Sequence, residues 1–335
     1  MSSAPTADEI ARDATWLAQA LDPAEGMVRL VAMDRESYRA ASFLDDRLLQ
    51  APVDKQILSW TLIEQAITDD LRSDARWIFH IGHVGSTLVS RLLGELDDVL
   101  AIREPRLLRD LALTPEDIRG RYVAPTPRLM SRTFSEAETA CVKATSFASE
   151  IAPQLVPPRE RALFMFATPA NYVASILAGE NSVQELQLLA GKRSQRLNSR
   201  SIYLPAQNDA GLAAAAWAAE ITALEAAAQA MEDRQIAWAD FDAMLGDMEA
   251  ELTRIARFFG FGAAPGQLSA IASGPLIRRY SKALEHEYSA AVRRELIAEA
   301  AERYRREIDA ALAMLNAGAE KSPLLARALA RARGD

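Results

Sequence analysis

The residues best suited to chemistry lie between positions 77 and 96, where an apolar run passes through a tight turn into a helical pattern. The turn reads Gly82-His83-Val84-Gly85-Ser86-Thr87, with two glycines and two hydroxyl side chains immediately before the helix. Glycines let backbone N–H groups close around a ligand, and a helix N-terminus adds partial positive charge. The turn therefore predicts an anion site suited to phosphate or sulfate.

Taken alone, the turn is not diagnostic of one activity. A nucleotide-hydrolysing loop would read G-x-x-x-x-G-K-[ST], and a dinucleotide-binding loop would read G-x-G-x-x-G. The turn has neither spacing and contains no lysine. A strand-to-helix turn with a purely structural role accounts for the two glycines equally well.

Two more chargeable side chains stand close to the ends of short apolar runs. Glu104 follows the run at 99–102, and Lys143 lies in the run at 140–144. In parallel sheets the carboxyl ends of the strands share one edge, and ligands bind there. We therefore expect Glu104, Lys143 and the turn to converge, with Glu104 as the candidate general base. The neighbouring arginines are expected to lower its pKa, and His80 is expected to point into the packing of the sheet.

These side chains need a parallel sheet to position them, and the sequence predicts one. Short apolar runs alternate with helical stretches from residue 76 onward, which is typical of a parallel sheet with right-handed crossovers. Several runs are continuously apolar, as expected for strands covered on both faces. The predicted fold class is α/β with about five central strands, at residues 77–81, 99–102, 140–144, 162–167 and 235–238.

The remaining segments are predicted to be helical additions or connections. Residues 1–73 are expected to form a helical extension on the core, with helices at 10–21, 38–49 and 57–71. Residues 74–318 form the main domain, in which 192–208 is a polar connection, 212–231 an alanine-rich buried helix and 292–315 a closing helix. Residues 319–335 are expected to be a fraying tail.

Composition limits the classes of function. The chain has 335 residues, half of them apolar, and a net charge of −8, which argues against a nucleic-acid or membrane-surface binder. One cysteine and three histidines form no pattern for zinc, so no metal is expected. The acidic start lacks the apolar core of a signal peptide, and no apolar run is long enough to span a membrane. A cytoplasmic protein is the expectation, and its oligomeric state is open.

The wider arrangement resembles the sulfotransferase family, whose members use 3′-phosphoadenosine 5′-phosphosulfate (PAPS) and have a P-loop-type, three-layer α/β fold. The resemblance covers roughly residues 76–304. It rests on the strand, turn and leucine-paired helix, a Glu-Pro after the second strand, and Val-Lys-Ala-Thr at 142–145. Residues 163–175, Leu-Phe-Met-Phe-Ala-Thr-Pro-Ala-Asn-Tyr-Val-Ala-Ser, resemble the family's strand–Arg-x-Pro–helix–Ser element.

The resemblance implies roles for particular residues. Gly85, Ser86 and Thr87 would cradle the 5′-phosphosulfate, with backbone donors from Gly82, Val84 and Leu88, and Ser175 would contact the 3′-phosphate. Two positions depart from the family: its usual turn cation is His83 here, and its arginine before the proline is Ala167. His83, assisted by Lys143, would then stabilise the leaving phosphate, while arginine forks suit the 3′-phosphate. The candidates for that second task are Arg196, Arg200, Arg279 and Lys282.

The resemblance implies sulfuryl transfer to a hydroxyl or amine of a small molecule or glycan, without a metal. The acceptor pocket is expected to draw on the N-terminal helices and on residues 114–133 and 192–208. Two alternatives are open. One is a sulfotransferase-like binding or regulatory protein that has drifted from catalysis, favoured by His83 and Ala167. The other is a small-molecule kinase or nucleotide hydrolase, disfavoured by the missing turn lysine.

Overall fold

The computed structural model describes residues 4–278 and 290–334. At its centre lies a five-stranded sheet in the order β5-β6-β4-β7-β8, and every neighbouring pair is parallel. All five predicted strands are confirmed, each to within two residues at either end. Their bounds are β4 (Arg76–His80), β5 (Val99–Arg103), β6 (Thr139–Lys143), β7 (Arg161–Phe166) and β8 (Gln235–Asp240).

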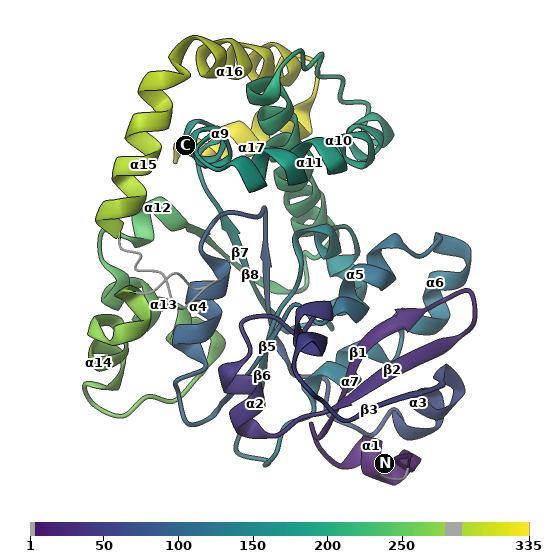
Figure 1. The fold of residues 1–335 in the computed structure, drawn as a ribbon. Helices are drawn as coiled ribbons and strands as arrows, with labels where there is room; N and C mark the ends of the chain where they lie inside the picture. The colour runs from purple at the N-terminus through teal and green to yellow at the C-terminus, as the bar shows by residue number, and fades with distance from the viewer. Residues whose placement is uncertain (1–3, 279–289, 335) are drawn as a thin grey trace.

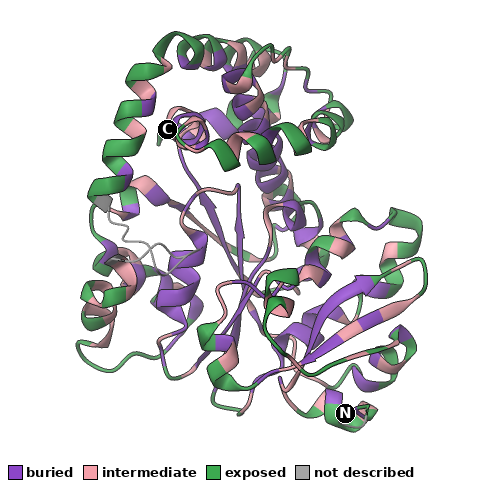
Figure 2. Ribbon diagram, viewed as in Figure 1, coloured by how far each residue is buried: buried purple, intermediate pink, exposed green. Residues whose placement is uncertain are grey.

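Helices cover the sheet, and the strands β4, β5, β6 and β7 are almost entirely buried (Figure 2). The edge strand β8 is mostly half-buried. The helix α11 (Asp209–Ala230) packs against several others, and Trp217, Ile221 and Leu224 are fully buried as predicted. Its many alanines allow this, because small side chains let neighbouring helices approach closely. The other helices between β4 and residue 278 are α4 (Ser86–Leu93), α5 (Arg106–Leu113), α6 (Glu116–Val123), α7 (Thr126–Ser131), η2 (Ser146–Ile151), α8 (Ala152–Leu155), α9 (Pro169–Leu177), α10 (Glu180–Ser199), α12 (Phe241–Met244), α13 (Met248–Phe259), α14 (Gln267–Ser273) and η3 (Pro275–Arg278).

The N-terminal segment corrects the prediction of a mainly helical extension, because it also contains strands. It forms a three-stranded antiparallel sheet in the order β1-β2-β3, visible beside the main sheet in Figure 1. The missed signal is the Pro23–Gly26 turn between two apolar runs, since such a turn favours a hairpin. The elements are α1 (Ala7–Arg12), β1 (Trp16–Asp22), β2 (Met27–Ala32), α2 (Arg35–Ala40), η1 (Asp46–Gln50), β3 (Lys55–Ser59) and α3 (Trp60–Ala66).

Buried arginines fasten this N-terminal segment to the core. Arg103, 1% exposed at the end of β5, donates hydrogen bonds to the carbonyl oxygens of Tyr38 and Ala41. The Leu44 N–H donates to the Arg103 carbonyl at 2.8 Å. These bonds tie the chain after α2 to the carboxyl end of β5, so that Phe43 and Arg47 reach the edge where the site lies.

Three predictions about connections and ends are also corrected. Residues 192–199 belong to the helix α10, because Leu186, Arg193 and Leu197 recur at helical spacing on its buried side. The closing helix is two helices, α15 (Ala290–Arg303) and α16 (Arg305–Ala319), and the expected fraying tail is the helix α17 (Pro323–Arg333). Four apolar residues of α17 are buried, and its Arg331 guanidinium lies 3.8 Å from the Trp238 ring centroid. In the part of the chain the structure describes, no helix combines the length and apolar character needed to cross a bilayer.

Candidate active site

The predicted turn connects β4 to α4 and has a strained backbone. Gly82, His83 and Gly85 all have positive φ, at 81°, 54° and 60°. Glycine adopts this left-handed region without penalty, but His83 does so at a cost of about 1–3 kcal/mol. Gly85 is required for a second reason, because a Cβ there would lie 1.9 Å from Cζ of Phe241. The Phe241 ring thus closes one side of the turn.

The start of α4 is built to accept an anion. Gly85 is its N-cap and provides no side-chain cap for the helix. The first N–H groups of a helix have no partner within the helix and carry its partial positive charge. Ser86 and Thr87 follow at once, each 4% exposed, and both line a cavity. Backbone N–H groups and hydroxyls therefore converge on one side of the turn.

That cavity has a volume of about 450 Å³ and gathers most of the predicted site residues. Glu104, Lys143 and Ser175 reach it from three different elements, which confirms the expected convergence at one sheet edge. Other side chains on its wall come from the N-terminal segment and from later helices, namely Phe43, Arg47, Glu185, Arg193, Phe241 and Arg293. The predicted residues lining it are Gly82, His83, Val84, Gly85, Ser86, Thr87, Leu88, Glu104, Lys143 and Ser175.

A buried charged cluster lies on the cavity floor. The Lys143 ammonium, on a side chain 1% exposed, donates a short hydrogen bond to Oε1 of Glu104. Nε2 of His80 lies 3.5 Å from the same oxygen. Burial by itself would raise the pKa of the Glu104 carboxyl, but Lys143 and His80 outweigh it and hold that pKa well below its usual range. Glu104 is therefore ionised across the neutral range.

The cause of this lowered pKa differs from the prediction. The adjacent arginines do not supply it: Arg103 binds backbone carbonyls, and Arg106 pairs with Asp46 and Asp110. Glu104 also has a positive φ of 51°, so both it and His83 hold uncommon backbone conformations for non-glycine residues. Such strain gathers at functional sites, because surrounding structure must enforce it.

His80 is a site residue that the sequence interpretation placed elsewhere. It lines the cavity, and its Nδ1 accepts a hydrogen bond of 2.9 Å from the Gly82 N–H. That bond puts the proton of the neutral ring on Nε2, which faces Glu104. His80 thus joins the turn to the Glu104–Lys143 pair. Its position as the last residue of β4, directly before the turn, was the available signal.

His83 lines the cavity from the turn itself. Its ring meets the ring of Tyr172 edge to face, with centroids 6.3 Å apart. Tyr172 is buried on α9, three residues before Ser175. The contact therefore places the imidazole between the turn and the helix that carries Ser175.

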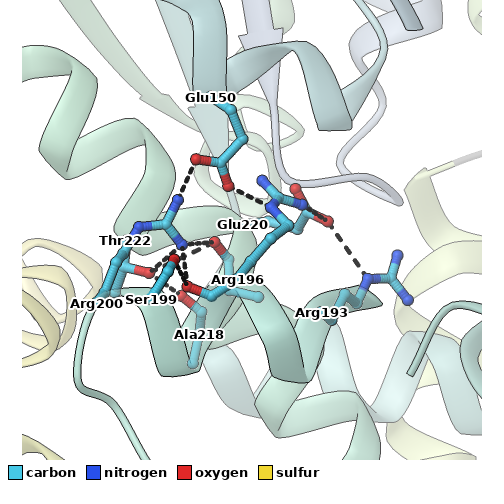
Figure 3. A network of polar contacts seen from close by, with 9 residues as sticks. Glu150, Arg193, Arg196, Ser199, Arg200, Ala218, Glu220 and Thr222 are labelled. Carbon is cyan, nitrogen blue, oxygen red and sulfur yellow. Dashed lines mark hydrogen bonds and ion pairs between the residues drawn. The ribbon is translucent and has the colours of Figure 1, made fainter. Parts of the chain in front are cut away.

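Two of the four remaining predicted nucleotide contacts lie within the described residues, and neither lines this cavity. Arg196 and Arg200 do not line it, because they extend from α10 to the carboxylates of Glu150 and Glu220 (Figure 3). Glu150 joins both arginines, and Glu220 is fully buried. The arginine pair thus fastens α10 to α11 and η2. Arg279 and Lys282 lie outside the described residues.

The solved structures similar to this chain include two sulfotransferase domains. The Sulfotransferase Domain from the Curacin Biosynthetic Pathway is 10% identical, covering 70% of this chain and 99% of that domain with a TM-score of 0.43. The Sulfotransferase Domain from the Synechococcus PCC 7002 Olefin Synthase is 13% identical, covering 62% and 80%, with a TM-score of 0.37. No protein-family model and no curated protein matches the sequence. Similarity at this level carries no argument about activity, so the functional conclusion rests on the site.

Proposed function

We propose that this protein is a PAPS-dependent sulfotransferase acting on a hydroxyl or amine of a small molecule or glycan. One observation carries the proposal: the uncapped start of α4, the Glu104–Lys143 pair and Ser175 line a single cavity. Backbone donors, a fixed ammonium and a carboxylate are the groups that transfer of a charged group requires.

The residues on the cavity fit a nucleotide with anionic groups at both its 5′ and its 3′ end. Ser86, Thr87 and the turn N–H groups would hold its 5′ end, since helix starts bind phosphate and sulfate. Ser175, one turn along α9 from the Tyr172 ring, would contact the 3′-phosphate. When bound, PAPS supplies an activated sulfuryl group and leaves as 3′,5′-ADP. The cation that the turn lacks at His83 has a substitute in Lys143, which is buried on the same cavity.

The roles of Glu104 and Lys143 follow from their pairing. Glu104 holds the Lys143 ammonium in place, so the positive charge is fixed before reaction and needs no reorganisation. A carboxylate with a lowered pKa is a weak base at equilibrium. It is nevertheless ionised, and the acceptor oxygen or nitrogen becomes strongly acidic as its new bond forms. Glu104 can then receive that proton late in the reaction.

Binding of the product nucleotide tests the proposal without knowledge of the acceptor. Titration calorimetry of the folded protein with 3′,5′-ADP should give a dissociation constant in the micromolar range, about −8 kcal/mol. 5′-AMP should bind more weakly. A folded sample that releases no heat and shows no thermal stabilisation with 3′,5′-ADP would contradict the proposal.

Glu104→Gln should lower turnover by about 10²–10⁴-fold, because it removes the proton acceptor. The measurement is the transfer rate from PAPS to any acceptor found in a screen of phenols, alcohols, amines and sugars. Affinity for 3′,5′-ADP should be retained. Glu185→Gln is the matched control, an exposed carboxylate on the same cavity, and should change the rate by no more than about threefold. An unchanged rate in Glu104→Gln would remove Glu104 from the chemistry.

A second candidate is a nucleotide-binding protein of the same fold that has lost transfer. The observations favouring it are His83 and Ala167 at positions where the family carries cations, and the engagement of Glu104 by Lys143. It predicts binding of 3′,5′-ADP with no transfer to any member of the acceptor panel. Transfer to one acceptor, abolished by Glu104→Gln, decides against it.

A further inference from the structure

The wall of the cavity around Ser175 contains a buried arginine with no role so far. Arg193 lies on α10, is 8% exposed and lines the same cavity as Ser175. It sits one residue after Lys192, three before Arg196 and seven before Arg200. Of the basic residues in this stretch it alone borders the cavity, because α10 turns Arg196 and Arg200 toward Glu150.

Arg193 is held by one end of its guanidinium. Its Nε donates to Oε1 of Glu220 at 3.3 Å. Figure 3 shows its two terminal nitrogens turned away from Glu220, and no hydrogen bond to another described residue engages them. A guanidinium anchored in this way is pre-oriented for a second anion, since its fork matches the oxygens of a phosphate.

The ion-pair network around Arg193 has a net positive charge. Glu220 serves two arginines, because Nη1 of Arg196 lies 3.0 Å from the same Oε1. The network contains Arg193, Arg196 and Arg200 against Glu150 and Glu220, so three cations face two carboxylates (Figure 3). The other arginines on the cavity have carboxylates of their own: Arg47 pairs with Asp45, and Arg293 with Asp242.

Arg193 is also close to the helix that carries Ser175. It acts electrostatically on Tyr172: burial raises the pKa of that phenol, and Arg193 opposes the rise. Tyr172 and Ser175 are one turn apart on α9, where the Ser175 hydroxyl donates to the Tyr172 carbonyl oxygen. Ser182, in the first turn of α10, lines the same cavity as Ser175.

We propose that Arg193, anchored by Glu220, binds the 3′-phosphate of the nucleotide together with Ser175 and so replaces the arginine missing at Ala167. This inference rests on the proposed function. It assigns binding of the 3′-phosphate to Arg193 on α10. The neighbouring Arg196 and Arg200 have a structural role instead, because their ion pairs hold α10 in place.

The test compares 3′,5′-ADP with 5′-AMP, which lacks only the 3′-phosphate. By titration calorimetry the wild-type protein should bind 3′,5′-ADP about 10–100-fold more tightly, as charge-assisted hydrogen bonds allow. Arg193→Gln should lose most of this preference while its affinity for 5′-AMP stays within about threefold. Arg193→Lys keeps the positive charge but removes the paired terminal nitrogens of the guanidinium. It should therefore retain part of the preference for 3′,5′-ADP over 5′-AMP. Arg200→Gln removes a cation of the same network that does not face the cavity, and its preference should equal that of wild type.

The outcomes separate the two proposals. If the wild-type protein binds neither nucleotide, the proposed function fails and this inference fails with it. If the wild type prefers 3′,5′-ADP and Arg193→Gln keeps the full preference, the function stands and Arg193 is not the ligand. If Arg193→Gln lowers the affinity for 3′,5′-ADP and for 5′-AMP by the same factor, the inference is also overturned, because the substitution then has a general effect on the cavity. Should Arg193→Gln fail to fold, Arg193→Lys decides: an unchanged preference overturns the inference.

Discussion

Lys143→Met is expected to lower the free energy of unfolding by about 3–5 kcal/mol at neutral pH, because it leaves the Glu104 carboxylate buried without its ammonium. The Glu104 side chain is only 17% exposed, and Lys143 is its nearest cation. Methionine fills nearly the same space as lysine, so lost packing contributes little. Urea unfolding at several pH values measures the effect, and affinity for 3′,5′-ADP should fall in the same variant.

The loss of stability in Lys143→Met is expected to depend on pH, because the substitution changes the pKa of Glu104. In the wild-type protein the pKa of Glu104 is lowered on folding, so its pairing stabilises the fold above the unfolded pKa of about 4.3 and is lost as the pH falls through the lowered value. In Lys143→Met, burial dominates and raises that pKa, so the carboxylate penalises folding at neutral pH and is protonated in acid. The difference between the two proteins should therefore be clearly smaller at pH 4 than at pH 7.

A double variant provides the control. Lys143→Met with Glu104→Gln replaces the ion pair by neutral side chains of similar size and should recover most of the lost stability. It should not recover transfer activity, because both charged groups are gone. Equal destabilisation at pH 4 and pH 7, or no recovery in the double variant, would show that the pair does not account for the loss.

Gly85→Ala is expected to cost about 2–5 kcal/mol and to weaken 3′,5′-ADP binding by about tenfold or more. The left-handed backbone, with φ at 60°, costs an alanine about 1–2 kcal/mol. The added methyl would lie 1.9 Å from Cζ of Phe241, and overpacking costs about 1–3 kcal/mol more. Relieving the clash moves the turn, so backbone hydrogen bonds to the nucleotide are lost.

Gly82→Ala separates backbone strain from the clash. Its φ is 81°, but no atom lies within 4 Å of the added methyl, so it should cost only about 1–2 kcal/mol. In a Phe241→Ala background, Gly85→Ala should cost less than in the wild type, because the clashing ring is absent. Urea unfolding of the wild type, the two single variants Gly85→Ala and Phe241→Ala, and the double variant measures this coupling. Equal costs for the two glycines, or no coupling to Phe241, would contradict the packing explanation.

The sequence predicted the central sheet because parallel strands covered on both faces require continuous apolar runs. All five runs became strands, and the convergence of Glu104 and Lys143 on the turn followed from the shared edge. The N-terminal segment was mispredicted because its residues 10–21 also suit an amphipathic helix. There the deciding signal was a short turn between two runs, and a hairpin gains its stability from long-range strand pairing.

The local sequence pattern could not predict which side chains contact one another in the folded protein. His80 reads as another buried strand residue, yet it bonds to the turn at one ring nitrogen and faces Glu104 with the other. Arg193, Arg196 and Arg200 read as one basic stretch, and the angle of α10 sends only Arg193 to the cavity. The packing of Phe241 on Gly85 joins residues more than 150 positions apart.

The sequence by itself determined that a glycine turn would stand between a buried strand and a helix, because backbone freedom and apolar periodicity are local properties. Only the tertiary structure decided which charges meet there. Lys143, Glu104 and His80 come from three strands or strand ends, and their pairing sets the pKa of the carboxylate. Electrostatic interactions depend on distance and burial in the folded molecule, and spacing along the chain fixes neither.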